Sequence, residues 1–329
     1  MIATTGFFDG VHRGHRLVIE RLVSLARERG DESLVVTFWP HPRAVLQDGA
    51  RELRLLTTLE EKKALLTALG VSCVEVLDFT RSFAALTAEQ FLRDVLRDRF
   101  GVTTLLMGYD NRVGSDRLTA SNLRPLAEAV GIELIELESL SFRAEPQGTP
   151  LSFRAELQGT PLSFRAEPQG TPLSFRAEPQ AESRNLEISS TKIRKSLEEG
   201  DIASATAMLG YGYSLKGVVV AGNRLGRTIG FPTANMRLYE PLKLVPGRGV
   251  YVVEVQVLGK TWRGMTNIGL RPTVGGTFTT IETHILDFDE DIYGLPLTIT
   301  FLLRLRDEIH FPSLDALKAQ LERDRAACR

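Results

Sequence analysis

Apolar residues in the first 140 positions follow two alternating patterns. Short apolar runs of strand length occur at 2–5, 33–38, 71–77, 102–107 and 132–137. Between them apolar residues recur at helical spacing, first at 16–29. Strands that alternate with helices are typical of βαβ units, whose strands lie parallel in one sheet. The pattern therefore predicts a doubly wound α/β domain.

Two helix starts in this region carry a predicted capping box. In this motif a hydroxyl residue and a Glu or Gln three positions later satisfy backbone amides at the first helical turn. Thr58 with Glu61 precedes one predicted helix, and Thr87 with Gln90 precedes another at 91–100. We therefore expect these two helices to begin at those residues.

A tandem repeat interrupts this rhythm. Three complete eleven-residue copies begin at Ser141, Ser152 and Ser163, and a partial copy begins at Ser174. Pro and Gly in nearly every copy exclude a continuous helix, whereas alternating apolar and polar residues favour short strands joined by turns. Each complete copy has one Arg and one Glu, hence no net charge for binding phosphates or nucleic acid. We expect the segment at about 141–183 to be a poorly ordered insertion in a surface loop.

The pattern changes after Gly210. Strand-like runs follow at 215–221, 250–257, 261–268, 279–286 and 297–303 with no helical pattern between them. A turn at 258–260 is predicted to join two of these strands in a hairpin. Several strands without intervening helices predict a closed antiparallel β-barrel. A helix at 314–321, with Ser313 as its cap, is predicted to follow the barrel.

The chain of 329 residues is long enough for two domains with separate cores, which we place at 1–210 and 211–329. Hydrophobic content of 43% and charged content of 25% are typical of a globular protein. The net charge of −1 gives no basic field for nucleic acid, and no apolar run reaches membrane-spanning length. Two cysteines make a disulfide framework unexpected. We therefore expect a cytoplasmic protein, monomeric or weakly homo-oligomeric, with neither nucleic-acid nor membrane partners.

The most distinctive stretch follows the first predicted strand: Gly6-Phe7-Phe8-Asp9-Gly10-Val11-His12-Arg13-Gly14-His15. A strand-to-helix turn is where α/β sheets bind phosphate groups, and its glycines let the backbone approach a ligand closely. His12 and His15 are three residues apart, so they share one face of the first helical turn. Two imidazoles there suit the charge on a phosphoryl group in transfer. Half of a metal site, or solvated cap residues, are the alternatives.

This string resembles the ATP-binding motif of the HIGH-type nucleotidyltransferases. Its Phe-Asp-Gly-Val-His sequence is closest to the FMN adenylyltransferase half of bacterial bifunctional riboflavin kinase/FAD synthetases. The resemblance implies a Rossmann-like nucleotidyltransferase fold for the first domain, in which His12 and His15 stabilise charge on the ATP phosphates. It also implies an ATP-binding set that consists of Gly6, Phe8, Asp9, Gly10 and Gly14.

A second segment of this domain, Gly108-Tyr109-Asp110-Asn111-Arg112-Val113-Gly114, follows a predicted strand at its carboxyl end, where such sheets place ligands. It resembles the Gly-Tyr-Asp…Phe-Gly segment of the same synthetases, with Val113 in place of the usual Phe. The resemblance implies that Asp110 and Asn111 bind the flavin.

A third segment, Ile188-Ser189-Ser190-Thr191-Lys192-Ile193-Arg194, begins a helix with a hydroxyl cap. Backbone amides, hydroxyls and two cations converge in its first turn. A plain N-cap with a basic solvated face is the alternative. The string resembles the second signature of the nucleotidyltransferase superfamily, which implies that Ser189, Ser190 and Thr191 bind phosphates and that Arg194 is catalytic.

A glycine-rich run from Gly222 to Asn235 follows the first strand of the second domain, with glycines at every fourth position: Gly222, Gly226 and Gly230. This spacing lets backbone donors wrap a phosphate chain, although no Walker A ending is present. Thr233 and Asn235 offer the oxygen ligands that Mg²⁺ prefers. A long hairpin loop with a Pro turn is the structural alternative. The run resembles the defining motif of riboflavin kinases, which implies ATP binding by the glycines and Arg227 and Mg²⁺ binding by Thr233 and Asn235.

Three later segments, at 267–273, 281–284 and 287–294, agree with that resemblance. It implies that Glu282 is the general base of the kinase reaction and that Asn267 and Arg271 bind the flavin. A glutamate on a barrel strand is more often a surface charge that faces water. We assign His284 a structural role.

Together the motifs imply a bifunctional enzyme that uses ATP and Mg²⁺. It would phosphorylate riboflavin to FMN in the barrel and adenylylate FMN to FAD, releasing pyrophosphate, in the α/β domain. Riboflavin, FMN and ATP are the expected small-molecule partners. Two alternatives stay open. One is a riboflavin kinase whose first domain is inactivated by the repeat, and the other is a flavin-binding regulatory module without turnover.

Overall fold

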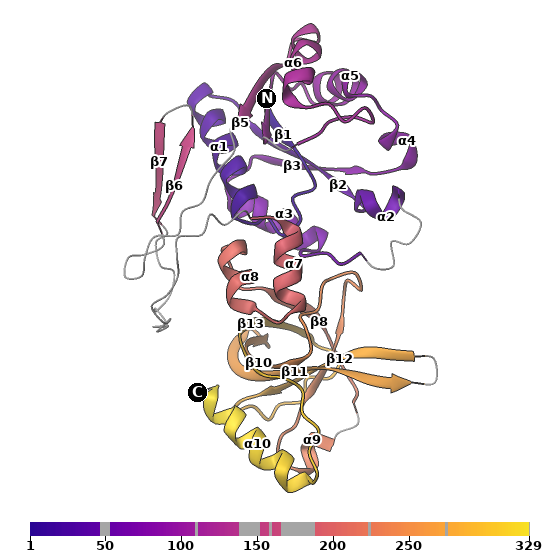
Figure 1. Cartoon of the computed structure of the whole chain (residues 1–329), viewed down its shortest axis with the longest axis vertical. Coiled ribbons are helices and arrows are strands. Elements are labelled where there is room, and N and C mark those ends of the chain that lie inside the picture. The colour runs from indigo at the N-terminus through magenta and orange to yellow at the C-terminus, as the bar shows by residue number, and fades with distance from the viewer. Residues whose placement is uncertain are drawn as a thin grey trace. The chain divides into compact units, whose positions relative to one another are not determined.

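A computed structural model describes residues 1–46, 53–108, 111–137, 152–157, 160–165, 188–222, 225–273 and 276–328. The chain forms two compact units. The first contains Met1–Glu52 and Leu59–Ile188, and the second contains Leu53–Thr58 and Ser189–Arg329. Figure 1 shows the helices and strands of both units.

The first unit is built on a parallel sheet of five strands in the order β3-β2-β1-β4-β5. The strands are β1 (Ile2–Thr5), β2 (Ser33–Trp39), β3 (Cys73–Asp78), β4 (Thr104–Gly108) and β5 (Glu133–Leu137). Thr4 of the central strand pairs with Val35 and Leu106 of its neighbours. Because both faces of such a sheet are buried, its strands are continuous apolar runs rather than alternating ones. The predicted doubly wound sheet is confirmed.

Helices cover both faces of this sheet (Figure 1). They are α1 (Arg13–Arg29), α2 (Pro42–Leu46), α3 (Leu59–Ala68), α4 (Arg81–Ala84), α5 (Ala88–Gln90), the π-helix η2 (Phe91–Arg99) and α6 (Ala120–Ala129). Ile19 of α1 and Leu66 of α3 belong to the core on one face, together with Val35. Leu92 of η2 belongs to the core on the other face, together with Val36. The two cores therefore use alternate residues of β2.

The capping box predicted at Thr87 is confirmed. The Thr87 hydroxyl accepts a hydrogen bond from the Gln90 amide at 3.2 Å, and the Gln90 side chain accepts one from the Thr87 amide at 2.9 Å. The following helix is a π-helix, which the sequence pattern does not distinguish from an α-helix. The box at Thr58 and Glu61 stays a prediction, although α3 begins directly after Thr58.

Part of the repeat forms a hairpin, where we expected a poorly ordered loop. Strands β6 (Ser152–Leu157) and β7 (Thr160–Arg165) pair antiparallel, with Phe153 opposite Phe164. Strand β7 begins inside one copy and ends inside the next, so the hairpin does not use one strand per copy. The other residues of 141–183 lie outside the described residues.

The second unit is a closed barrel in the order β10-β11-β12-β9-β8-β13, with neighbouring strands antiparallel. The strands are β8 (Ser214–Val220), β9 (Ala234–Leu238), β10 (Gly249–Val257), β11 (Lys260–Thr273), β12 (Gly276–Ile285) and β13 (Pro296–Arg306). The predicted barrel is confirmed. The turn between β10 and β11 has φ of +52° at Leu258 and +72° at Gly259, the positive values that a tight hairpin requires.

Strand β9 is absent from our prediction, which placed a loop between the first two barrel strands. Its sequence, Ala-Asn-Met-Arg-Leu, is short and carries one buried apolar residue, Met236. Pairing with neighbouring strands makes this segment a strand, because β9 pairs with β8 on one side and with β12 on the other. The barrel is also accompanied by α9 (Leu225–Thr228) and α10 (Leu314–Ala327). The Ser313 cap of α10 is confirmed, since its hydroxyl accepts from the Ala316 amide at 3.2 Å.

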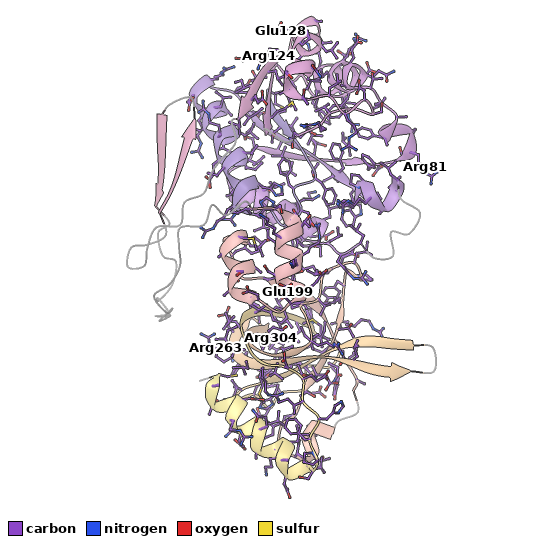
Figure 2. All side chains as sticks on the ribbon, viewed as in Figure 1. Arg81, Arg124, Glu128, Glu199, Arg263 and Arg304 are labelled. Atoms are coloured by element: carbon purple, nitrogen blue, oxygen red, sulfur yellow. The ribbon has the colours of Figure 1, made fainter. Side chains whose placement is uncertain are left out.

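Helices α7 (Ser190–Glu198) and α8 (Ile202–Leu209) belong to the barrel unit, although our prediction places the domain boundary after residue 210. The Gly247 amide donates to the Leu197 carbonyl at 2.8 Å. The Arg304 guanidinium donates to the carbonyls of Glu199, at 3.4 Å, and Arg248, at 2.6 Å. Figure 2 labels Arg304 and Glu199. These bonds connect the end of α7 to β13 and to the segment before β10.

Candidate active sites

The turn after β1 is buried and strained. Phe8 and Val11 have φ of +52° and +34°, in the left-handed region that residues other than glycine rarely adopt, and Gly10 has φ of +81°. Phe8, Asp9 and Val11 are all buried. Strain of this kind costs about 1–3 kcal/mol per residue and is commonly found at functional sites. A Cβ on Gly6 would come within 3.0 Å of the Phe8 ring, which explains the glycine there.

The two histidines of the motif lie together, as the spacing predicts. His12 is the buried N-cap of α1, and its Nδ1 accepts a hydrogen bond from the His15 amide at 3.3 Å. The imidazole rings stack with centroids 3.6 Å apart. A Cβ on Gly14 would lie 3.3 Å from the His12 ring. His12 is therefore a cap but not a solvated one.

His15 offers an unpaired nitrogen. Its Nδ1 is buried without a hydrogen-bond partner among the residues that the structure describes. Burial lowers the pKa of His15 well below its ordinary value, and the nearby His12 and Lys62 lower it further. The ring is thus a neutral donor or acceptor at physiological pH. Within the described residues no group of three or more His, Cys, Asp and Glu side chains could hold a metal ion.

Lys62 is a residue of this site that the sequence motifs missed, and α3 places it against the same turn. Its Nζ donates to the Phe7 carbonyl and to the Thr37 hydroxyl, both at 3.0 Å, and lies 4.0 Å from the centroid of the Phe7 ring. Burial lowers the pKa of Lys62 to about 8, and the charge of Asp9 opposes that shift. A signal was present in the sequence, because Lys62 lies four residues before the buried Leu66 and hence on the buried face of the helix.

The remaining predicted residues of the nucleotidyltransferase motifs divide between the units. Asn111 belongs to the first, and its side-chain amide donates to the carbonyl of Thr5, the last residue of β1, at 3.2 Å. Asp110 lies outside the described residues. Ser189 caps α7 in the second unit by accepting from the Lys192 amide at 3.3 Å, and Ser190 and Thr191 begin that helix. Arg194 donates from Nε to the carbonyl of Arg54 at 2.8 Å.

In the barrel, three predicted residues lie in one row across neighbouring strands. Glu282 of β12 is directly opposite Asn235 of β9 and directly opposite Asn267 of β11. Residues directly opposite each other share a face of the sheet. All three are half-buried. The side chain of Arg271, further along β11, is outside what the structure describes.

The glycines of the run before β9 make room for neighbouring groups. A Cβ on Gly222 would lie 2.7 Å from Cγ of Asn235. A Cβ on Gly226 would collide with the Phe231 carbonyl, and the Phe231 amide donates to the Gly226 carbonyl at 2.8 Å. Gly230 has φ of +85°, where glycine is strongly favoured.

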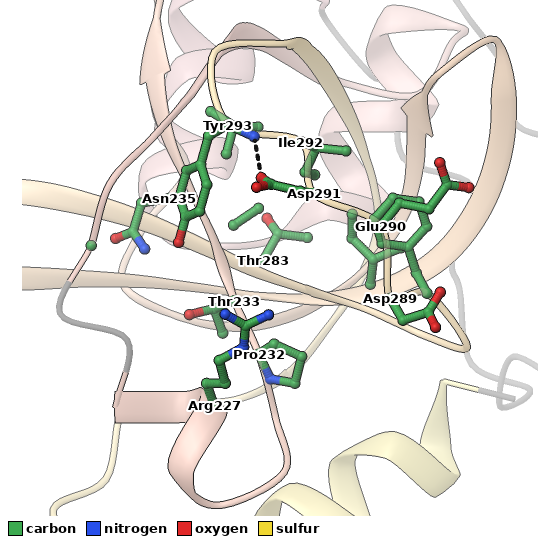
Figure 3. Close-up of a pocket in the computed structure, with 15 residues that line it drawn as sticks. Arg227, Pro232, Thr233, Asn235, Thr283, Asp289, Glu290, Asp291, Ile292 and Tyr293 are labelled. Carbon is green, nitrogen blue, oxygen red and sulfur yellow. Dashed lines mark hydrogen bonds between the residues drawn. The ribbon is translucent and has the colours of Figure 1, made fainter.

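A cavity of about 350 Å³ opens beside these residues (Figure 3). Its lining includes Gly222, Arg227, Thr233 and Asn235. The opposite wall is the acidic loop 289–291, whose residues received no individual roles from the motifs, and Asp291 Oδ1 accepts from the Tyr293 amide at 3.1 Å. The lining of this cavity thus combines a positively charged side chain, two neutral side chains with oxygen atoms that can bind a metal ion, and carboxylates.

A second cavity, of about 560 Å³, contains Glu282 and Asn267. Apolar residues of the barrel and of α10 form much of its wall: Ile229, Phe231, Val250, Met265, Leu314, Leu317 and Leu321. Thr233 lines both cavities. The apolar wall suits a flat, largely apolar ring system, and Glu282 lines the same cavity as the shared Thr233.

His284, to which we assigned a structural role, packs against the segment before β9 and also lines the second cavity. It is buried, its Nδ1 is 2.8 Å from the Pro232 carbonyl, and its ring centroid is 5.1 Å from that of Phe231. Burial lowers its pKa, so the ring is neutral at physiological pH. His284 therefore fixes the segment that leads from the glycine run to Thr233.

Comparison with known proteins identifies the family of the chain. A family model described as FAD synthetase matches residues 1–147, and one described as riboflavin kinase matches residues 209–329. The bifunctional riboflavin kinase/FMN adenylyltransferase of Escherichia coli (strain K12) is 35% identical over 329 residues, which cover 100% of this chain and 91% of that protein. The chain belongs to the bifunctional riboflavin kinase/FMN adenylyltransferase family. The resemblance seen in its motifs is thereby confirmed.

A relative in this family from Listeria monocytogenes serovar 1/2a is 33% identical over 327 residues, covering 98% of this chain and 90% of that protein. The fold has a solved counterpart in a protein from Streptococcus pneumoniae, titled a macrolide-efflux protein. That structure matches with a TM-score of 0.79 at 28% identity, covering 100% of this chain and 93% of that one. Among the described residues, no helix is long and apolar enough to cross a membrane.

Proposed function

We propose that this chain phosphorylates riboflavin to FMN in the barrel. We also propose that it adenylylates FMN to FAD with the nucleotidyltransferase motifs, of which the run from Gly6 to His15 is the first. Each reaction uses one ATP. The observation that carries the proposal is the pair of adjoining cavities that share Thr233, with Glu282 in one of them. The stacked His12 and His15 at the start of α1 support the second reaction.

In the kinase reaction the flavin occupies the apolar cavity and ATP occupies the smaller one. Glu282 accepts the proton of the ribityl 5′-hydroxyl as that oxygen attacks the γ-phosphorus and ADP leaves. A general base of this kind contributes about 10²–10⁴-fold. Arg227 and the backbone of the glycine run balance the phosphate charge, because positioning and electrostatics dominate phosphoryl transfer. Asn267 and Arg271 hold the flavin.

A divalent ion, Mg²⁺, fits the donor set of the smaller cavity. Thr233 and Asn235 supply a hydroxyl and an amide oxygen, and Mg²⁺ takes few protein ligands while keeping waters and phosphate oxygens. Because Gly222 has no side chain, the Asn235 amide occupies space that a Cβ at position 222 would fill. The bound ion would neutralise charge on the transferred phosphoryl group.

In the adenylyl reaction an FMN phosphate oxygen attacks the α-phosphorus of ATP, and pyrophosphate leaves. The nucleophile is already ionised, so no general base is needed. His12 and His15 donate hydrogen bonds to phosphate oxygens, which a neutral imidazole does from one ring nitrogen. Ser189, Ser190, Thr191 and Arg194 bind the ATP phosphates, and Asp110 and Asn111 contact the flavin. These roles rest on the motif resemblance.

Chromatography of riboflavin, FMN and FAD tests the proposal. The purified chain is incubated with ATP and Mg²⁺, once with riboflavin and once with FMN. We expect FMN and then FAD from riboflavin, and FAD from FMN. FMN without FAD would favour the alternative of a riboflavin kinase alone. Flavin binding without either product would favour the regulatory module.

Composition bears on the cellular compartment of the protein. We propose a cytoplasmic protein, since a chain with two cysteines and no disulfide framework is ordinary for a reducing compartment. We also propose a monomer or a weak homo-oligomer that acts on small molecules. Light scattering after size-exclusion chromatography, over a range of protein concentrations, measures the assembly directly.

A further inference from the structure

Lys62 is a buried cation in the first unit for which the reaction scheme above has no use. Only 1% of the residue is exposed. Its Nζ donates to two neutral oxygens, those of Phe7 and Thr37. Burying an ammonium group is expensive, and neutral acceptors compensate for that loss of hydration only in part. A residue of this type needs an explanation beyond packing.

The need to pair the backbone groups of the turn does not explain why a charged lysine is buried at position 62. The Thr37 hydroxyl itself donates to the Phe7 carbonyl, at 3.2 Å, so this carbonyl has a partner without Lys62. A neutral lysine would still have two N–H donors for the same two oxygens. What the ammonium adds to the site is therefore its positive charge.

That charge lies among the groups of the motif. Asp9, in the turn, is the acidic residue whose charge acts on Lys62. At the start of α1, burial lowers the pKa of His15, the charges of His12 and Lys62 lower it further, and His12 stacks on His15. The His41 ring packs against Phe7, the residue whose carbonyl accepts from Lys62, and the two ring centroids are 4.1 Å apart. The field of the ammonium thus reaches the imidazole of His15.

We propose that Lys62 is a positioning residue for adenylyl transfer: the charge of its buried ammonium makes the turn electropositive where the ATP phosphates bind. The inference rests on the proposed adenylyl transfer, and it extends the histidine motif to a residue on another helix. Lys62 acts through the turn and through His15. Polyphosphate charge in turn favours the protonated lysine, so the bound anion and the buried cation stabilise each other.

The sign of the pH dependence follows. The pKa of Lys62 is lowered to about 8, so about nine-tenths of it is charged at pH 7. Charge is lost as pH rises through 8, and kcat/KM for ATP in FMN adenylylation should fall there. Bound ATP raises this pKa, so the corresponding fall in kcat should appear at higher pH. His15 is neutral throughout this range and does not contribute to the fall.

Three variants of the full chain test the inference. Lys62→Met removes the charge and the two hydrogen bonds but keeps the length of the side chain. Lys62→Arg keeps the charge to high pH. Lys63→Met is the matched control, because Lys63 is exposed on the same helix. FMN adenylylation and riboflavin phosphorylation are measured for each by chromatography between pH 6.5 and 10.

We expect Lys62→Met to lose about 10- to 100-fold in kcat/KM for ATP in adenylylation, less than the loss of a donor in direct contact. The pH profile of Lys62→Met should lack the fall in kcat/KM near pH 8. Lys62→Arg should recover activity, and its kcat/KM should fall only at higher pH. Lys63→Met should match the wild type. Riboflavin phosphorylation should be unchanged in all three variants.

Two results would overturn the inference. One is wild-type adenylylation with a flat kcat/KM profile from pH 7 to 9.5, a measurement that needs no variant. The other is Lys62→Met with the wild-type rate. A wild-type chain that forms no FAD at all refutes the proposed adenylyl transfer itself, and is distinguished from both.

Discussion

Replacing Gly222 with alanine tests the kinase cavity through geometry alone. The added methyl would lie 2.7 Å from Cγ of Asn235, 3.0 Å from its Oδ1 and closer still to its Nδ2. Ordinary contact begins near 3.4 Å, so the amide must move by about 1 Å. A misplacement of that size costs up to about 10²-fold in rate, or about 3 kcal/mol of transition-state stabilisation. Gly222 has no positive φ, so its backbone accepts alanine.

The assay follows riboflavin conversion to FMN while Mg²⁺ is varied, because a displaced metal ligand should raise the Mg²⁺ requirement as well as lower kcat. FMN conversion to FAD by the same preparation is the internal control. Gly259→Ala is the matched variant. Its φ of +72° makes alanine strained by about 1 kcal/mol, but nothing lies within 4 Å of the new Cβ. Kinase activity of Gly222→Ala within twofold of wild type, at every Mg²⁺ concentration, would refute the assignment of Asn235.

Three further predictions concern the separation of the activities. Glu282→Gln should reduce FMN formation from riboflavin by about 10²–10⁴-fold while FAD formation from supplied FMN persists; a wild-type kinase rate would remove Glu282 from its role. His15→Ala should give the reciprocal result, losing about 10²–10³-fold in FAD formation with the kinase intact; an unchanged rate would mean that His15 only packs. Deleting residues 152–173 should leave both activities within a few-fold. Among the described strands, hairpin β6–β7 pairs with no other, and closing a loop of about 28 rather than about 50 residues changes the closure free energy by only about 0.5 kcal/mol. Selective loss of FAD synthesis after the deletion would place the repeat in the adenylyltransferase site.

The sequence determined the elements whose signal is local. Apolar runs at 33–38 and 102–107 became central parallel strands, since strands buried on both faces show no alternation. The turn at Leu258 and Gly259, the cap at Ser313 and the capping box at Thr87 each depend on a few adjacent residues. The motif from Gly6 to His15 also carried its own geometry, because the side chain of an N-cap residue lies against the residue three positions later in the first helical turn.

Tertiary structure alone decided the features that join distant segments. Strand β9 exists because the barrel closes around it: β8 and β12 supply the hydrogen bonds that its own five residues do not predict. Helix α10 became a wall of the cavity that contains Glu282 through its packing on the barrel. Asp324 of α10 is buried against Arg306 of β13, with Oδ2 2.7 Å from the guanidinium nitrogen, and both residues lie far from the glycine run in sequence.

Lys62 shows the same limit at a single residue. Its place on the buried face of α3 is readable from the helical period, but its partners are not. Phe7 is 55 residues away and Thr37 is 25 away, and α3 and β2 must pack together before the ammonium reaches either oxygen. Side-chain spacing encodes which face of an element is buried, whereas the contents of a site depend on which buried faces meet. Only the folded chain settles that, because packing and burial act between segments that no local pattern connects.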